Sequence, residues 1–116
     1  MEEKHSGPSG GLTPGQKEVL SLLAAYQEGS VVSRTVINNR EGTVTIFAFD
    51  KGEGLNEHTA SYDALLHILE GRAEITISGK KSFLEQGEVI LLPAGRPHAV
   101  KALTRFKMLL TMIRTR

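Results

Sequence analysis

Two histidines, His58 and His98, lie in sequence surroundings that would allow their imidazoles to bind a metal, a ligand or a proton. His58 follows Gly52 at the end of a polar stretch, and His98 directly follows a turn rich in proline and glycine at residues 93–97. An imidazole can ligate a transition metal, bind a polar or anionic ligand, or exchange protons near its ordinary pKa of about 6.5. His58 and His98 are therefore the candidates for a metal site or a small-molecule site.

The other candidate ligands are few. The chain has no cysteine, so a metal ion would need nitrogen or oxygen ligands. His5 lies in a polar stretch, and we expect it to be idle. Where Ala64 points into a core, the alternation of a strand turns His67 to the opposite face. We therefore expect His67 to lie outside the site, satisfied by hydrogen bonds in a packing layer.

Short strands are the elements that would position the two histidines. From residue 31 onward, β-branched residues and period-two alternation predominate, interrupted by turns rich in Gly, Asn, Asp and Pro. Eight strands at such close spacing predict an all-β fold, a small barrel or sandwich. The predicted strands are residues 31–37, 43–49, 64–70, 73–78, 81–84, 88–92, 98–102 and 105–113.

One short α-helix is predicted before the strands. Thr13 can cap a helix, Pro14 suits its first position, and Gln16 completes a capping box. Apolar residues between positions 19 and 26 would form one face, and Gly29 would end the helix. The expected organisation is a mobile tail at residues 1–11, a helix at residues 12–29 and a barrel at residues 30–116.

Composition limits the class of protein. The 116 residues, 40% of them hydrophobic, suffice for one domain, and the net charge is +1. That charge provides no general attraction to nucleic acid or to an anionic membrane. The basic residues after position 95 are interleaved with apolar ones and lack an aromatic stacking platform. We expect a soluble cytoplasmic protein that binds neither nucleic acid nor membrane, since no stretch approaches the roughly 20 apolar residues of a membrane span.

Two spaced motifs give the chain a family likeness. The sequence resembles the cupins, whose first motif reads G-x5-H-x-H-x3-E-x6-G and whose second reads G-x5-P-x-G-x2-H-x3-N. More narrowly, it is similar to small single-domain cupins of the conserved-barrel, RmlC-like type that have no assigned activity. The resemblance covers about residues 42–113 and implies a double-stranded β-helix, or jelly-roll barrel. The corresponding positions are Gly52, His58, Ala60, Ala64 and Gly71 in the first motif, and Gly87, Pro93, Gly95, His98 and Ala102 in the second; Ala60, Ala64 and Ala102 stand where the motifs have His, Glu and Asn.

The resemblance also implies an incomplete metal site. Metal-dependent cupins hold their ion with two histidines and a glutamate from the first motif and one histidine from the second. His58 and His98 occupy two of those positions, whereas Ala60 and Ala64 cannot ligate a metal. The expected cofactor is at most a weakly or substoichiometrically bound divalent ion (Fe, Ni, Zn or Mn).

Other residues are predicted to shape the pocket. Ala60 and Ala64 make it larger and less polar than a complete site, which favours a partly apolar ligand. Tyr62 either contributes its hydroxyl to the rim or packs there. Arg96 either binds a carboxylate or phosphate at the mouth or is a solvated turn residue. Met108 belongs to an alternating stripe that either lines the cavity or forms plain core, and sequence does not decide which face of residues 105–113 turns inward.

Three functional readings follow from these patterns. The leading one is a small-molecule binding barrel with a degenerate two-histidine metal site. The second is an enzyme that uses His58 and His98, either as a metal-dependent oxygenase or as a metal-free isomerase or lyase. The third is a non-catalytic module that binds a partner through the exposed helix. The apolar outer face indicated by Leu65 and Leu69 also predicts a homodimer.

Overall fold

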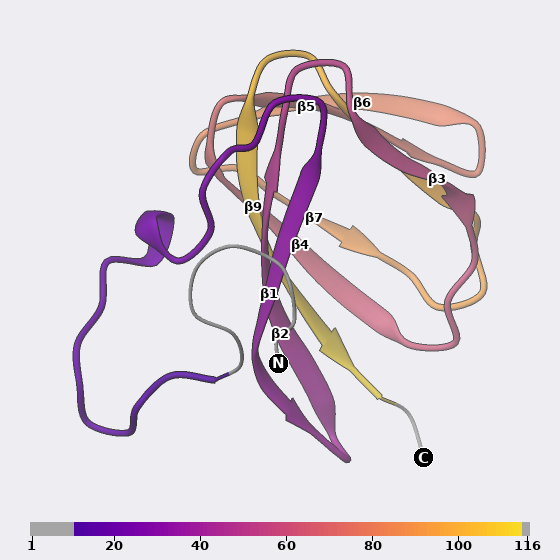
Figure 1. Cartoon of the computed structure of the whole chain (residues 1–116). Coiled ribbons are helices and arrows are strands. Elements are labelled where there is room, and N and C mark those ends of the chain that lie inside the picture. Colours follow the sequence, from indigo (N-terminus) through magenta and orange to yellow (C-terminus); the bar gives the residue numbers. More distant parts are fainter. Residues whose placement is uncertain (1–10, 115–116) are drawn as a thin grey trace.

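The computed structural model describes residues 11–114 and contains two antiparallel β-sheets that face each other (Figure 1). The five-stranded sheet has the order β1-β2-β9-β4-β7, and the four-stranded sheet has the order β3-β8-β5-β6. This is a jelly-roll barrel, as predicted. The strands are β1 (Val31–Asn39), β2 (Gly42–Phe49), β3 (Gly54–His58), β4 (Asp63–Glu70), β5 (Arg72–Ile77), β6 (Lys80–Glu85), β7 (Val89–Leu92), β8 (His98–Ala102) and β9 (Phe106–Ile113).

Alternation along the strands builds the core between the sheets. In β4, Ala64, Leu66 and Ile68 are buried in this core, whereas the intervening Leu65 is exposed and His67 only half-buried. The aromatic rings of Phe49 and Phe106 stack with their centroids 4.4 Å apart. Ala64 therefore points into the core, and His67 lies on the opposite face of β4, as its position in the alternation requires.

Strand β3 (Gly54–His58) is absent from the sequence prediction. Only Leu55 among its five residues is even partly buried, so the segment carries no hydrophobic alternation. Its strand conformation instead comes from antiparallel pairing with β8, in which Gly54 lies opposite Lys101 and His58 lies opposite His98. This pairing is a long-range contact, which a local pattern cannot reveal.

The predicted α-helix at residues 12–29 is wrong. Its only helical part is a three-residue 3-10 turn, η1 (Leu20–Leu22). Thr13 does not cap a helix; its carbonyl oxygen accepts a hydrogen bond from the backbone N–H of Gln16 (3.1 Å), with Gly15 at a φ of +80°. Proline followed by a left-handed glycine is typical of a type II turn. Within residues 11–114, no helix is long and apolar enough to cross a membrane.

Residues 19–26 instead form a strap across the outer face of the five-stranded sheet. Leu23 and Ala24 of this strap are buried in a second apolar cluster with Ile46 and Ala48 of β2. The outer face of the sheet needs an apolar cover, and the irregular segment supplies it by burying two consecutive side chains. A short isolated helix is only marginally stable, so this packing overrides the local preference for a helix. The strap begins in the indigo segment on the left of Figure 1.

Polar contacts hold the strap in place. The Tyr26 hydroxyl donates a hydrogen bond to the Glu70 carboxylate (2.6 Å), and the Lys107 ammonium donates to the carbonyl oxygen of Ser21 (2.5 Å). Burial and the neighbouring Glu70 carboxylate raise the pKa of Tyr26 well above its ordinary value. Lys107 is 7% exposed and lies 4.9 Å from the centre of the Tyr26 ring. These contacts therefore hold the strap against the outer face of β9, while the inner face of β9 lines the barrel.

Candidate functional site

The structure brings the two predicted histidines together. His58 ends β3, His98 begins β8, and the two residues are cross-strand partners. Their Nε2 atoms lie 3.2 Å apart, and their ring centroids are 4.4 Å apart with an angle of 69° between the ring planes. His98 is 6% exposed, whereas His58 is open to solvent. The pair therefore has one buried member and one member that an incoming molecule can reach.

Backbone carbonyls orient both imidazoles. The Nδ1 atom of His58 lies 2.9 Å from the carbonyl oxygen of Asn56, and the Nδ1 atom of His98 lies 3.2 Å from that of Arg96. Because a carbonyl oxygen only accepts hydrogen bonds, both Nδ1 atoms must carry their hydrogen and donate it. In the neutral rings, both Nε2 atoms then present a lone pair toward the same point.

Two lone pairs facing each other across 3.2 Å repel, unless a proton or another electrophile lies between them. Burial, followed by the nearby His58 ring, lowers the pKa of His98, and its hydrogen bond to the Arg96 carbonyl only partly opposes this. Desolvation thus favours the neutral form of the buried ring. The arrangement is that of a preformed acceptor pair.

The acceptor pair fits two ligands of one metal ion. Two nitrogens that are each about 2.0–2.1 Å from an ion lie about 2.9–3.4 Å apart when the angle between them is about 90–110°. The observed 3.2 Å falls inside that range. Hydrogen bonds from Nδ1 to backbone carbonyls are also the usual way in which proteins orient metal-binding histidines.

The protein supplies few further metal ligands. Among residues 11–114, no group of three or more His, Asp or Glu side chains is placed to share an ion. Ala60 and Ala64 occupy the positions at which the family motif has its other ligands. An ion held by His58 and His98 would therefore complete its coordination with water or a bound ligand, which makes its binding weak.

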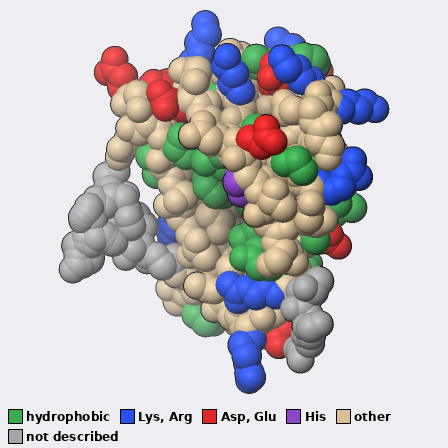
Figure 2. All heavy atoms as spheres, turned by 90° about the vertical axis from the view of Figure 1, so that its right-hand side faces the viewer, with side chains coloured by type: hydrophobic (Ala, Val, Ile, Leu, Met, Phe, Trp, Pro, Cys, Tyr) green, Lys and Arg blue, Asp and Glu red, His purple; other side chains and the backbone are tan. Residues whose placement is uncertain are grey.

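Loops fix the end of the barrel that carries the histidines. The backbone N–H of Gly95 donates to the carbonyl oxygen of Ala60 (2.8 Å), and that of Ala94 donates to the Asp63 carboxylate (2.8 Å). These bonds tie the loop after His58 to the turn before His98. Figure 2 shows one face of the molecule, with a histidine side chain near its centre beside hydrophobic side chains.

The remaining predicted pocket residues lie at different depths. Ala60 and Tyr62 are half-buried in the loop after β3, and Ala64 is buried on the inner face of β4. Met108 is 0% exposed in the main core, so the stripe that contains it faces inward. A ligand would therefore have to displace core side chains to reach Met108. Met112, the partner of Ala64 on β9, is only partly buried and was not predicted as a pocket residue.

The backbone and the side chain of Arg96 make separate hydrogen bonds. Its carbonyl oxygen accepts the hydrogen bond from His98, whereas its guanidinium Nε donates to the hydroxyl of Ser78 in the turn between β5 and β6 (2.9 Å). The Arg96 side chain is exposed. It therefore reaches a hydroxyl of the neighbouring turn, an interaction that no sequence signal indicated.

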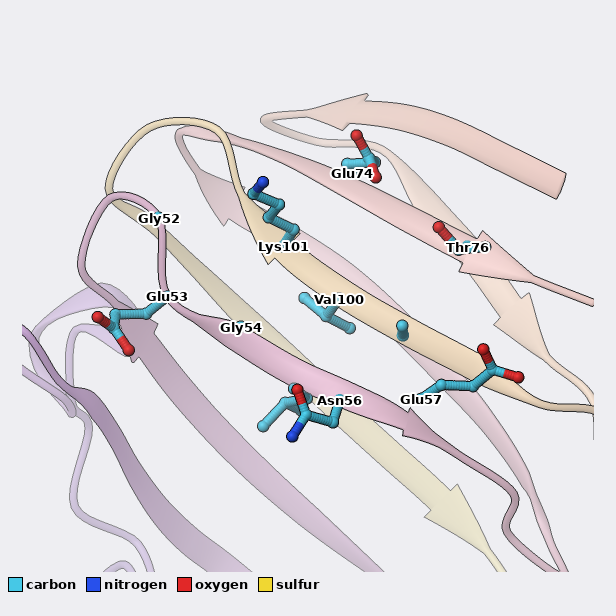
Figure 3. A pocket seen from close by; sticks show the side chains of 11 residues that line it. Gly52, Glu53, Gly54, Asn56, Glu57, Glu74, Thr76, Val100 and Lys101 are labelled. Carbon is cyan, nitrogen blue, oxygen red and sulfur yellow. The ribbon is translucent and has the colours of Figure 1, made fainter. Parts of the chain in front are cut away.

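Sequence reasoning also missed a hollow on the outer face of the four-stranded sheet. This hollow has a volume of about 600 Å³ and is lined by β3, β8 and β5. Figure 3 shows Glu74 and Lys101 on neighbouring strands and Glu57 near the end of β3. Glu74 also forms an ion pair with Lys81 (3.6 Å). Neither histidine lines this hollow, which is separated from them by the sheet.

Comparison with known proteins agrees with this architecture. The family model of the cupin domain matches residues 45–113, more than half of the chain. A conserved protein of unknown function from Streptococcus pyogenes is 29% identical, with 97% of this chain and 99% of that chain covered and a TM-score of 0.87. A cupin superfamily protein from Desulfitobacterium hafniense is 28% identical, covering 94% of this chain and all of that chain (100%), with a TM-score of 0.86.

A third solved structure matches over part of its length. The cupin 2 conserved barrel domain protein from Leptotrichia buccalis is 38% identical over 82% of this chain and 46% of its own, with a TM-score of 0.80. Residues 45–113, which the cupin family model matches, contain both histidine motifs and most of the strands. The chain therefore belongs to the cupin family.

Proposed function

We propose that this cupin barrel binds a small molecule at the end that carries His58 and His98, and that the two Nε2 atoms anchor it, directly or through a weakly held divalent metal ion. The observation that carries this proposal is the pair of Nε2 lone pairs 3.2 Å apart, both oriented by backbone carbonyls. Such a pair attracts an electrophile or a hydrogen-bond donor. The exposed side of His58 gives it access from solvent.

Iron, nickel or zinc suits this pair better than manganese, because imidazole nitrogen is a good ligand for the first three, whereas manganese prefers oxygen ligands. A bound ion would act as a Lewis acid that holds an oxygen or nitrogen atom of the ligand. The contribution of the protein is to orient His58 and His98 so that they need no rearrangement on binding. With two protein ligands only, the ion should exchange readily with the solution.

The walls favour a ligand with a partly apolar body. Next to the histidine motif, Ala64 replaces a family carboxylate with a methyl group, and its neighbours on β9 and β7 are Met112 and Leu92. The half-buried Ala60 and Tyr62 lie in the adjoining loop. A molecule with a polar group for the histidines and a small hydrophobic portion matches this lining.

Binding is better supported than catalysis. The Nδ1 atoms of the two imidazoles are bonded to backbone carbonyls, and the two Nε2 atoms lie 3.2 Å apart. Within the part of the chain that the structure describes, no carboxylate forms a hydrogen bond with either ring, so neither has the acidic partner that commonly orients a general base. The partner-binding alternative relied on an exposed helix, and that segment is the strap packed on the sheet.

A ligand screen tests the proposal. We would measure saturation-transfer NMR signals from a panel of partly apolar acids, alcohols and amides, with and without added ZnCl₂ or NiCl₂. At least one fragment should lose its signal when both His58 and His98 are replaced by alanine. The proposal fails if every fragment that binds the wild-type protein binds the folded double variant equally well.

A further inference from the structure

A separate hollow lies where the edges of the two sheets meet. It is bordered by β6 at the end of one sheet and by β7 at the end of the other, and has a volume of about 330 Å³. We call it the edge pocket. Half of its eight lining residues are polar or charged and half are apolar, and neither histidine is among them.

The polar side of the edge pocket carries only hydrogen-bond donors and hydroxyl groups. Its members are Ser78, Lys80, Ser82 and Arg96, and no lining residue is acidic. Two cations without a carboxylate in the lining create a positive potential that favours an anion. The guanidinium group adds a planar set of donors that matches a carboxylate.

The donors are held in place before any ligand arrives. The Arg96 Nε donates to the Ser78 hydroxyl (2.9 Å), and the backbone N–H of Ser78 donates to the carbonyl oxygen of Pro97 (2.8 Å). Ser78 has a φ of +49° and Gly79 a φ of +82°, the left-handed pair that a tight hairpin turn requires. The turn between β5 and β6 is thus fastened to the turn before β8, and the two share the donors of the edge pocket.

The other side of the edge pocket is hydrophobic. Ile77 and Ile90 pack against the main core, and Pro93 and Leu91 complete the lining. Leu91 is 56% exposed, so an apolar ligand that covers it would remove hydrophobic surface from water. The edge pocket therefore combines an anion-binding side with an apolar side within one small volume.

We propose that the edge pocket binds a small organic acid that carries one carboxylate on a short apolar body. Arg96 and Lys80 pair with the carboxylate, the hydroxyls of Ser78 and Ser82 hydrogen-bond to it, and Ile77, Ile90 and Leu91 contact the hydrocarbon part. The edge pocket is distinct from the histidine site because neither histidine lines it, although its residue Ile77 is the cross-strand partner of His98.

A matched set of probes tests the chemical class. Hexanoate, 1-hexanol and hexylammonium share one hydrocarbon chain and differ in the charged or polar group, and inorganic phosphate supplies an anion without the chain. In isothermal titration at low salt, hexanoate should bind at least about fivefold more tightly than 1-hexanol, hexylammonium should not bind, and added NaCl should weaken the binding of hexanoate. Equal affinities for hexanoate and 1-hexanol, or tighter binding of phosphate than of hexanoate, would overturn the proposal.

Variants locate the binding. Arg96→Gln and Lys80→Gln should each weaken hexanoate binding about fivefold or more. The matched controls Arg40→Gln and Lys51→Gln each remove one surface charge outside the edge pocket and should leave the affinity unchanged. An equal loss in variants and controls would mean that only net charge matters, which contradicts a built pocket.

One further variant separates this proposal from the histidine site. The double variant with His58→Ala and His98→Ala should keep the hexanoate affinity of the wild-type protein. If hexanoate binding is lost in that variant but kept in Arg96→Gln, the acid binds at the histidines and the edge pocket proposal is wrong.

Discussion

Replacing His58 by alanine should remove at least about half of the stabilisation that a divalent metal ion gives to the fold. His58 is the better of the two histidines to replace, because its side chain is exposed and its loss leaves no buried cavity, whereas His98 is 6% exposed. The two Nε2 atoms lie 3.2 Å apart, and among the described residues no group of three or more His, Asp or Glu side chains is placed to hold an ion elsewhere. The remaining imidazole alone cannot chelate.

The size of the effect follows from mass action. An ion present at about 100 times its dissociation constant stabilises the native state by about 2.7 kcal/mol. At roughly 4 °C per kcal/mol for a domain of this size, the melting temperature should rise by about 11 °C. If the loss of one imidazole raises the dissociation constant at least about tenfold, the gain falls to about 1.4 kcal/mol or less, and at most roughly half of the temperature rise remains.

The assay is differential scanning calorimetry of apo protein titrated with ZnCl₂ and, separately, NiCl₂, with isothermal titration to measure the dissociation constant. The matched control is His67→Ala, which removes a histidine from the outer face of β4 and should keep the full rise. His58→Ala and His98→Ala should lose metal binding to a similar extent, because each leaves a single imidazole, and the double variant should show no temperature rise. A wild-type temperature rise in His58→Ala, or an equal loss in His67→Ala, would refute the reasoning.

Three further predictions concern the site, the fold and the assembly. Ala60→His places an imidazole at the position of a family ligand and should tighten Zn(II) binding at least about tenfold in calorimetric titration; unchanged affinity would mean that the loop does not direct this residue to the pair. Arg105, by its hydrogen bond, lowers the pKa of Asp50 from 3.8 to about 2. This stabilisation exists above about pH 4 and is lost as the pH falls through 2, so urea unfolding should show Asp50→Asn less stable than wild type at pH 6 and equal to it near pH 2; a constant difference would contradict this. We also propose that two copies pair through the exposed outer face that contains Leu65 and Val89; light scattering should then show a dimer that Leu65→Glu converts to a monomer, and a wild-type monomer would exclude it.

Much of this protein can be predicted from local patterns. Alternation identified β4 and placed Ala64 and His67 on opposite faces of it, because the side chains of a strand have a period of two. The resemblance of two spaced motifs to those of the cupins indicated the jelly-roll barrel and selected His58 and His98 from four histidines. Strand alternation and motif spacing are both properties of contiguous sequence, so they can be read without a structure.

Other features were decided only by tertiary contacts. β3 has almost no buried residue and becomes a strand by pairing with β8, and the strap at residues 19–26 is shaped by the apolar sheet surface that it covers. The Nε2 lone pairs of the histidine site face each other because a backbone carbonyl accepts a hydrogen bond from the Nδ1 atom of each ring. Every residue has a backbone carbonyl, so the sequence does not show which of them will bind a histidine. The edge pocket likewise arises where β6 and β7, at the edges of different sheets, come together. The sequence by itself determined the barrel and the choice of histidines, while the tertiary structure decided their protonation pattern, their single shared point and the second pocket beside them, because those depend on contacts between distant parts of the chain.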